Sequence, residues 1–350
     1  MYKKIFMVIA AAAALTLVSC SSDDLNSLSD NSSKNEAISF DGYLGRSAVS
    51  VNGSRGSELT KEKLKTDGFG VFGNYKAVDG LEFGSNLFDN EKVTSSSSTE
   101  PVKWTYDNIK YWPTEGHIDF LAYAPYDSKY VNKVSSDNQK LEFTVNSTIK
   151  DQKDLLWANA ANKTMADNPV KFTFNHALAK IGYAVKKGVT DDNVTITLNK
   201  ITLAGSETDP KVGAFHTTGT IDLSKDLTNT ENQTALWTDC SGEQSFTWSS
   251  GFPNVTSSSF SAGSDYLFVI PQNFSTGKLY VIVDYTISYK DGVTAEMKST
   301  VSSQIVKNFE QGKAYKINLT IGLTKIDFDV TDVNKWTEDV NNNIDINTWN

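Results

Sequence analysis

Apolar and polar side chains alternate along most of the chain from residue 38 onward, in stretches separated by clusters of Gly, Asn, Asp and Ser. Such alternation is typical of strands that bury one face and expose the other. The clearest stretch is 194–203, and residues 279–289 predict a hairpin in which 290–292 turn the chain back along 294–301. Further strands are predicted at 117–124, 171–174, 181–185, 266–270 and 315–321. The pattern favours an all-β protein built of antiparallel sandwiches.

Helix signals are few. Ser57 can cap a short helix over residues 58–64, and Gly68 is placed to end it. Residues 84–90 and the Ser-rich stretch 94–99 have the composition of exposed loops.

The first twenty residues form a separate signal. Lys3 and Lys4 precede an apolar run over residues 5–18, which is shorter than the roughly twenty residues that a spanning helix needs. The run ends in Leu-Val-Ser-Cys20, which resembles the lipobox of bacterial lipoproteins and implies cleavage before Cys20 and a lipid anchor on it. The alternative is an ordinary secretory leader with a chance cysteine. Residues 21–24, Ser-Ser-Asp-Asp, resemble the acidic signal that sends such lipoproteins to the outer face of the outer membrane.

The chain without residues 1–19 has about 330 residues, which is enough for two domains. Residues 20–35 are rich in Ser, Asp and Asn and predict a flexible tether. We expect an N-terminal sandwich over 36–168 and a C-terminal sandwich over 169–350, because polar residues 159–168 before Pro169 suit a change of domain.

Charge and cysteine content narrow the possible partners. The net charge of −9 argues against nucleic acid, because phosphate binding needs clustered Lys and Arg. With Cys20 lipidated, Cys240 is left alone and no disulfide can form within the mature chain. No cofactor motif is visible, and the lipid is the expected link to the outer membrane.

Candidate catalytic or metal-binding residues are sparse. The three histidines are far apart in sequence and form no local metal motif. His117 and Asp119 can be read as an acid–base pair, although a solvated strand edge is favoured, and His176 is interpreted as packed or capping. Residues 329–345 carry oxygen ligands without the regular spacing of a calcium hand, so a polar loop is the favoured interpretation. We therefore expect a protein that is not an enzyme.

Large aromatic residues gather on two predicted strands around a proline turn. Trp104 is interpreted as a core residue, because Trp buries much area and needs one polar partner. For Trp112 a core position and an exposed sugar-stacking position are left equally open.

These aromatic residues belong to blocks with a recognisable order, which begins with Trp104-Thr-Tyr106, Tyr111-Trp112-Pro113 and Ala122-Tyr-Ala-Pro125. The other blocks are Ile38-Ser-Phe40 with Arg46-Ser-Ala48, Phe69-Gly-Val71-Phe72, Asp154-Leu-Leu-Trp157-Ala158, Phe172-x-Phe174-x-His176-Ala-Leu178 and Gly312-Lys-Ala-Tyr315. Together they resemble the fimbrillin-like family, the lipoprotein pilus subunits of Bacteroides-like bacteria. Residues 206–260 match no part of the family pattern.

The resemblance implies two tandem transthyretin-like sandwiches and assembly into a pilus by exchange of strands. In such pilins an arginine-specific protease removes the first strand, and a strand from another subunit takes its place. Arginine occurs here at positions 46 and 55 alone, in the window where the family is cut. Arg46 matches the family position, whereas Arg55 lies in a more open, glycine-rich stretch. Either cut would remove the first strand, which contains Ile38, Phe40, Tyr43 and Leu44.

The family implies a donor strand at the C-terminus. Residues 326–330 alternate cleanly, and Ile344, Ile346 and Trp349 close the chain as a candidate donor strand. This last segment can fill a neighbour or pair within its own chain. The expected partners are other pilus subunits, an arginine-specific protease and a surface receptor or glycan, while a tip, stalk or anchor position stays open.

Two other functions compete with a pilus subunit. The first is an anchored surface lipoprotein that binds glycans through Trp112 or Trp237 and keeps its lipid. The second is a secreted hydrolase with an accessory sandwich, which would require an essential Asp or Glu.

Overall fold

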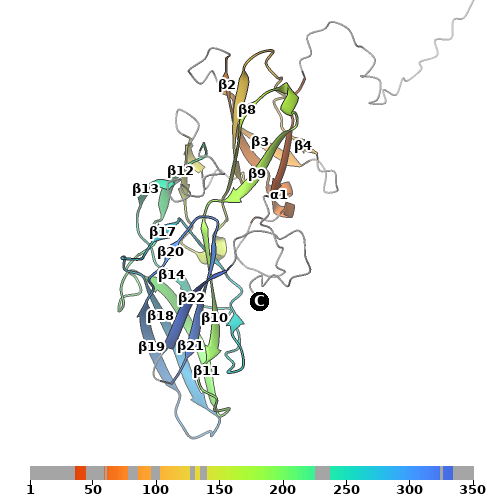
Figure 1. Ribbon diagram of the computed structural model, residues 1–350. Helices are drawn as coiled ribbons and strands as arrows, with labels where there is room; N and C mark the ends of the chain where they lie inside the picture. The colour runs from red at the N-terminus through yellow and green to blue at the C-terminus, as the bar shows by residue number, and fades with distance from the viewer. Residues whose placement is uncertain are drawn as a thin grey trace, which may run out of the picture. The chain divides into compact units, whose positions relative to one another are not determined.

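The computed structural model describes residues 36–44, 59, 61–77, 86–95, 103–126, 131–134, 140–224, 237–323 and 326–333 (Figure 1). Strands dominate these residues, and their α-helix is a single short element, α1 (Lys61–Asp67). Two 3-10 turns, η2 (Ile149–Asp151) and η3 (Met165–Asp167), lie between strands. The all-β fold expected from the alternation of side chains is confirmed.

The first sheet has seven strands and holds the N-terminal part of the described chain. Its order is β1 (Phe40–Leu44), β9 (Val170–His176), β8 (Leu156–Lys163), β5 (His117–Ala124), β2 (Phe69–Lys76), β3 (Asn86–Ser95) and β4 (Trp104–Thr105). Strands β1, β2, β3, β5, β8 and β9 all contribute buried side chains to one apolar core. The sheet therefore folds around a core of its own.

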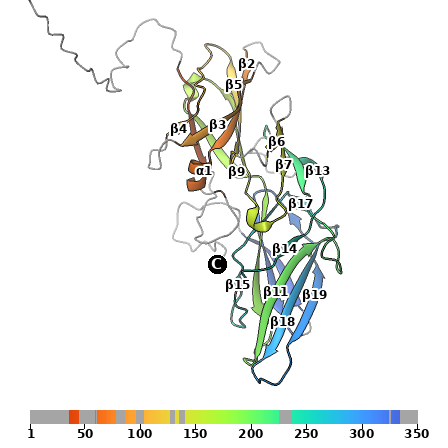
Figure 2. The same cartoon turned by 180° about the vertical axis from the view of Figure 1, so that it is seen from behind.

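Two further sheets share a second core. One contains β15 (Ser261–Ala262), β10 (Ala179–Lys187), β21 (Ala314–Ile321) and β22 (Ile326–Val333), with β16 (Leu267–Val269) also paired to β10. The other contains β14 (Phe246–Trp248), β11 (Val194–Ala204), β18 (Tyr280–Tyr289) and β19 (Met297–Gln304), seen from behind in Figure 2. Apolar side chains of β10 and β21 meet those of β11 and β18 in this core, as in a sandwich.

Two smaller sheets complete the fold. One has the order β13 (Trp237–Ser241), β12 (Thr218–Asp222), β7 (Lys140–Thr144) and β6 (Val131–Val134), and the other pairs β17 (Gln272–Asn273) with β20 (Asn308–Phe309). Among the strand pairs of the described residues, β1–β9 and β10–β21 are parallel and the rest are antiparallel. Two parallel pairings thus depart from the purely antiparallel sandwiches that the sequence predicted.

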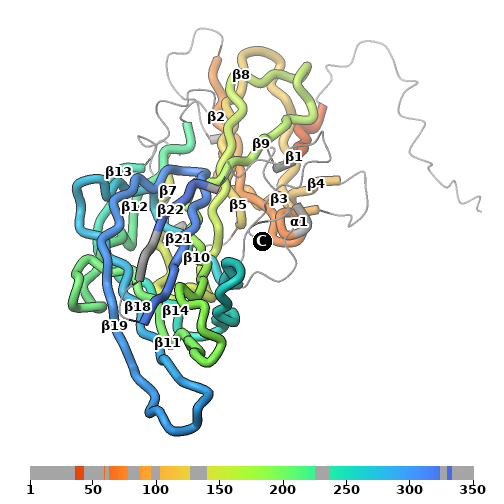
Figure 3. The backbone as a smooth tube through the Cα atoms, turned by 60° about the horizontal axis from the view of Figure 1, so that its bottom comes forward, coloured from red at the N-terminus to blue at the C-terminus, as the bar shows by residue number. Residues whose placement is uncertain are grey.

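Most predicted strands lie where the alternation placed them. Strand β11 covers the predicted 194–203, and β18 and β19, both labelled on the blue part of the tube in Figure 3, form the predicted hairpin. Gly68 follows α1 with φ of 73°, a conformation that glycine adopts without strain. The prediction of a loop at 84–90 is wrong from Asn86 onward, because β3 begins there and Phe88 is fully buried.

The sheet pairings cross the predicted domain boundary. Strand β9 follows Pro169 yet pairs with β8, and β7 pairs with β12 from the C-terminal half. The chain therefore does not pass from one sheet to another at residues 168–169, and the division into two domains stays a prediction. None of the helices in the described parts of the chain is long and apolar enough to cross a membrane.

Candidate functional site: the first strand

Residues 36–39, which lead into β1, are held from two sides by backbone hydrogen bonds. On one side Ile38 N–H donates to Lys110 O at 2.8 Å, and Trp112 N–H donates to Glu36 O at 3.0 Å. On the other side Val170 N–H donates to Ser39 O at 2.8 Å. The segment is therefore wedged between the loop before β5 and the start of β9.

The Asn168 side chain uses both of its polar atoms on this segment. Its Oδ1 accepts from the backbone N–H and the hydroxyl of Ser39, each at 2.9 Å. Its Nδ2 donates to Glu36 Oε1 at 2.7 Å and to Ala37 O at 3.0 Å. Asn168 thus works as a polar clamp on residues 36–39.

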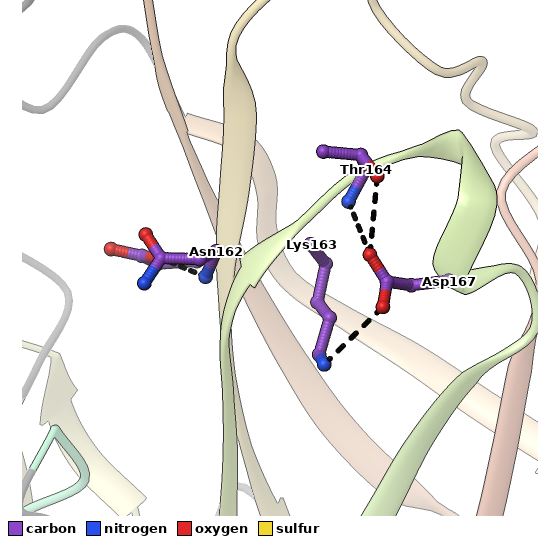
Figure 4. A network of polar contacts seen from close by, with 5 residues as sticks. Asn162, Lys163, Thr164 and Asp167 are labelled. Atoms are coloured by element: carbon purple, nitrogen blue, oxygen red, sulfur yellow. Dashed lines mark hydrogen bonds and ion pairs between the residues drawn. The ribbon is translucent and has the colours of Figure 1, made fainter.

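A capped turn between β8 and β9 positions this clamp (Figure 4). Asp167 Oδ2 accepts from Thr164 N–H at 2.9 Å and from its hydroxyl at 3.2 Å, and Lys163 Nζ lies 3.6 Å from Asp167 Oδ1. The Thr164 backbone bond is the main reason that the pKa of Asp167 lies below its ordinary value. At neutral pH the ionised carboxylate therefore fixes the residue next to Asn168.

The buried side chain of Tyr106 also hydrogen-bonds to this segment. Its hydroxyl donates to Ile38 O at 2.8 Å and accepts from Lys110 N–H at 3.1 Å. Burial raises the pKa of Tyr106, so the hydroxyl stays protonated and able to donate at neutral pH.

Strand β1 itself is an edge strand. It pairs in parallel with β9 from Phe40, opposite Val170, to Leu44, opposite Phe174. Among the described strands none lies on its other side in the sheet order, so within this part of the chain the backbone of residues 40–44 pairs with β9 alone. Leaving this position therefore breaks the ladder to β9, together with the hydrogen bonds that residues 36–38 make to residues 110–112.

Phe40 fills an aromatic cluster, which we call the Phe40 site. Its ring lies 5.3 Å from Phe88, 5.6 Å from Tyr106, 5.6 Å from Phe120 and 5.8 Å from Phe172, measured between centroids. Three of these contacts are edge-on or tilted and the one with Phe172 is stacked, which are the geometries that aromatic rings prefer. Only 4% of Phe40 is exposed, so the strand is anchored by a ring enclosed by other rings.

The next inward position of β1 has no side chain. A Cβ on Gly42 would meet Phe69 Cε1 at 3.1 Å and Phe174 Cε2 at 3.5 Å. The rings of β2 and β9 therefore cover the space that a side chain at position 42 would need.

The aromatic residues proposed for sugar stacking are buried. Trp112 is 3% exposed and contacts Phe120. Trp237 is 7% exposed, and its Nε1 donates to Ala177 O at 2.8 Å. Trp104 packs on Phe69. Trp104 is partly buried and packs against the core, in line with its core interpretation, and the open question at Trp112 is decided in favour of the core.

Asp154 and His176 form a buried pair of titratable side chains that the sequence did not predict. His176 Nδ1 lies 2.6 Å from Asp154 Oδ2, and the two side chains are 3% and 0% exposed. Leu59 N–H also donates to Asp154 Oδ2 at 3.4 Å. His176 is thus packed, as predicted, and its partner ties the chain before α1 to the end of β9.

The other candidates are dispersed. Asp119 pairs with Lys76 at 2.5 Å and accepts from Asn162 N–H at 2.7 Å, which suits a strand-edge carboxylate more than an acid–base pair with His117. Residues 329–333, expected to be a polar loop, belong to β22. In the described ranges no three His, Cys, Asp or Glu residues lie close enough together to hold a metal ion. Burial, followed by the charge of Asp239, raises the pKa of Cys240.

The structure brings together some of the predicted site residues. Ile38 and Phe40 are buried, and Tyr43 and Leu44 lie in β1 opposite Thr173 and Phe174. The remaining predicted residues fall outside the described residues: Cys20, Arg46, Arg55, Ile344, Ile346 and Trp349. Sequence reasoning missed Asn168, Tyr106 and Gly42, whose partners lie far away along the chain.

Comparison with known proteins points to one family. A family model described as fimbrillin-like matches residues 59–336. No curated protein matches the sequence. Among solved structures, a fimbrial protein from Bacteroides vulgatus is 23% identical with a TM-score of 0.65, over 86% of this chain and 99% of that chain.

Two candidate cell adhesion proteins show a weaker likeness of fold. The one from Parabacteroides distasonis is 10% identical with a TM-score of 0.51, over 87% of this chain and 97% of that chain. The one from Bacteroides uniformis is 17% identical with a TM-score of 0.50, over 86% and 98% respectively.

Proposed function

This chain belongs to the fimbrillin-like family, and from that premise we propose that it is a fimbrial subunit whose first strand is removed and replaced by a strand of another subunit. The observation that carries the proposal is the position of β1. Among the described strands it is an edge strand paired with β9, and its Phe40 ring fills a site lined by Phe88, Tyr106, Phe120 and Phe172. Such a strand can leave without disrupting the remaining ladders.

The vacancy left by β1 is unstable in water. Loss of the Phe40 ring opens a cavity at a cost of about 3–5 kcal/mol, which is the range for removing a buried Phe side chain. The edge of β9 also loses the hydrogen bonds of its parallel ladder. A strand that restores both is therefore strongly favoured, and assembly follows from removal of β1.

The predicted lipid anchor and the positions of the two arginines are consistent with the proposed removal of β1. Cys20 would carry the lipid that brings the precursor to the outer membrane, and a cut after Arg46 or Arg55 would release β1 together with the lipid. Because the chain has no other arginine, an arginine-specific protease would leave the remaining chain uncut. We favour Arg46, which lies two residues beyond Leu44, the last residue of β1.

The partners in this proposal are other pilus subunits, the protease and a surface receptor or glycan. The C-terminal segment with Ile344, Ile346 and Trp349 is a candidate donor strand. No catalytic role is proposed. The rival function, an anchored glycan-binding lipoprotein, loses support because Trp112 and Trp237 are buried.

The test is the intact mass and N-terminal sequence of the surface form, together with its size on an unboiled gel. We expect a chain that begins at Ser47, or at Gly56 if Arg55 is cut, with a ladder of multimers. Arg46→Ala or Arg55→Ala should abolish the ladder at the site that is used, and Arg46→Lys keeps the charge while removing the protease site. A lipidated chain that begins at Cys20 and forms no ladder would contradict the proposal and favour the anchored binding protein.

A further inference from the structure

Strand β19 forms an exposed edge of the sheet with the order β14, β11, β18 and β19. Among the described strands none pairs with its outer side, and Figure 2 shows β11, β18 and β19 in that order across the sheet. None of the residues of β19 is buried, and the exposed ones are Met297, Lys298, Thr300 and Gln304. The backbone of this edge is therefore open to solvent.

The hydrogen bonds at the end of β19 show which of its backbone groups face outward. Ile305 N–H donates to Leu279 O at 2.7 Å, one residue beyond the pair of Gln304 and Tyr280 in the same register. In an antiparallel ladder every second residue bonds to one neighbour. Residues 297, 299, 301 and 303 therefore turn their N–H and C=O groups toward β18. Residues 298, 300, 302 and 304 turn theirs toward the open edge.

The edge of β19 lacks most of the features that prevent pairing with other strands. Such features are charges, proline, bulges and a short strand. The other described edge strand of eight residues, β22, carries three aspartates, and β4, β14 and β15 have only two or three residues each. Strand β19 has no proline, pairs with β18 without a register shift, and has Lys298 as its single charge. A regular and nearly uncharged edge of this kind favours strand addition.

The sequence of β19 is complementary to a second copy of itself. In an antiparallel pairing with a two-fold axis at Val301, each Val301 faces its own counterpart. Residue 299 then lies opposite residue 303 of the second copy, residue 300 opposite 302, and residue 298 opposite 304. Valine meets valine, hydroxyl side chains meet each other, and Lys298 meets a glutamine. These are favourable or neutral cross-strand pairs, and no like charges are opposed.

This register also makes the largest number of hydrogen bonds. With the axis at Val301, all four outward-facing residues lie opposite outward-facing residues of the second copy. An axis at Thr300 or at Ser302 would leave one end of the strand without a partner residue. The backbone and the side chains of β19 therefore favour the same pairing.

We infer that two copies of this chain pair through β19, antiparallel about Val301, and so join their two sheets into one continuous sheet. The paired area is small next to the roughly 1,200–2,000 Å² of a stable interface, so we expect a weak dimer with a Kd on the order of 0.1–1 mM. In a fimbria, which rests on the proposed function, the same edge recurs on every subunit. Many weak contacts in parallel then hold two fibres side by side.

The experiment uses the full chain with Arg46→Ala and Arg55→Ala, so that arginine-specific cleavage and the strand exchange that follows it do not contribute. Sedimentation equilibrium from about 0.01 to 1 mM measures self-association. Hydrogen exchange at low and high concentration locates it. The amides of Lys298, Thr300 and Ser302 should gain protection at high concentration, whereas those of residues 299, 301 and 303, already bonded to β18, should not change.

Substitutions at Gln304 test the register. Gln304→Lys sets two pairs of like charges opposite each other and should weaken the dimer about fivefold, whereas Gln304→Glu sets a carboxylate opposite each Lys298 and should tighten it about fivefold. Both effects oppose the change in net charge, because copies with a net charge of −9 repel each other less after gaining a lysine. The matched controls are Thr197→Lys and Thr197→Glu at an exposed position of β11, which should follow the net charge.

Three results would overturn this inference. The first is no self-association up to about 1 mM, or protection confined to amides outside β19. The second is a set of Gln304 variants that follow the net charge, because residues 298 and 304 would then not face each other. The third is protection of the outward amides only in a chain that keeps its arginines and has been cut, because the occupant would then be a strand freed by processing. The removal of β1 is tested separately, by the N-terminal sequence of the surface form.

Discussion

Asn168 and Ser39 are joined by two hydrogen bonds although 129 residues separate them in the chain. The same Asn168 carboxamide donates to Glu36 and Ala37, so one side chain satisfies four polar groups of the segment that leads into β1. Because the segment also hydrogen-bonds to the loop before β5, the start of the first strand is held more firmly than an edge strand of this length would be by its ladder alone.

Replacing Asn168 with Ala should therefore loosen the first strand. We expect the free energy of unfolding to fall by about 1–3 kcal/mol, because several hydrogen bonds of about 0.5–1.5 kcal/mol net are lost. Amide exchange at Ser39 should accelerate, and so should proteolysis between β1 and α1. The matched control is Asn175→Ala, which removes a hydrogen bond to Thr173 O on the same strand. Unchanged exchange at Ser39 would contradict the role of Asn168 as a clamp.

Truncation of Phe40 should be far more costly than truncation of an exposed phenylalanine. Phe40→Ala is expected to lower the free energy of unfolding by about 3–5 kcal/mol, because it leaves a cavity among aromatic rings. Phe260 is 42% exposed, so Phe260→Ala should cost about 1 kcal/mol or less. Urea unfolding of the two variants measures the difference. Equal effects would show that the Phe40 site does not anchor β1.

The sequence predicted those parts of the fold that leave a local pattern. In β11, buried apolar side chains alternate with exposed polar ones from Val194 to Leu198, and the strand lies where it was expected. Strand β3 leaves a weaker pattern, since it is largely polar, has Asn90 at a φ of 51°, and pairs with β2 through register shifts. Its alternation is broken, so its composition was interpreted as a loop.

Long-range pairing leaves no such pattern. Nothing in residues 140–144 indicates that they pair with 218–222, and nothing in Ser39 indicates Asn168. In the first strand, the apolar positions Ile38 and Phe40 were predictable from alternation. The parallel direction of β1 and the closed space above Gly42 were not, because they depend on rings that β2 and β9 supply.

The buried pair of Asp154 and His176 should contribute strongly to stability. Asp154→Ala leaves the imidazole without its 2.6 Å partner in the interior, and breaking such a pair typically costs about 3–5 kcal/mol. Asp154→Asn keeps an oxygen acceptor and should cost less. Glu310→Ala, which removes a surface ion pair with Lys313, is the control, with an expected effect of about 0–1 kcal/mol. Equal unfolding midpoints for Asp154→Ala and Glu310→Ala would contradict this prediction.

The turn that carries Asn168 should weaken in acid. The pKa of Asp167 is lowered in the folded chain, first by the Thr164 backbone hydrogen bond and then by Lys163. Because the pKa of Asp167 is lowered on folding, the unfolded chain binds the proton more readily than the folded chain. The stability that the ionised carboxylate contributes is therefore complete above the ordinary pKa of 3.8 and is lost as pH falls through the pKa of the folded chain. The protection factors of the Thr164 and Ser39 amides, taken relative to their intrinsic exchange rates at each pH, should fall over that window, while Asp167→Asn should show low protection at Thr164 at every pH.

A measurement at high salt should distinguish the two causes of the lowered pKa of Asp167, the hydrogen bond from Thr164 and the charge of Lys163. The Lys163 interaction spans 3.6 Å between side chains that are both in contact with solvent, so about 1 M salt should screen most of it. The hydrogen bond from Thr164 N–H is a short-range contact at 2.9 Å and should persist. A carboxyl titration followed by NMR should therefore still show a lowered pKa for Asp167 in high salt. Return of that pKa to its ordinary value would mean that Lys163, not the capped turn, holds the carboxylate that orders Asn168.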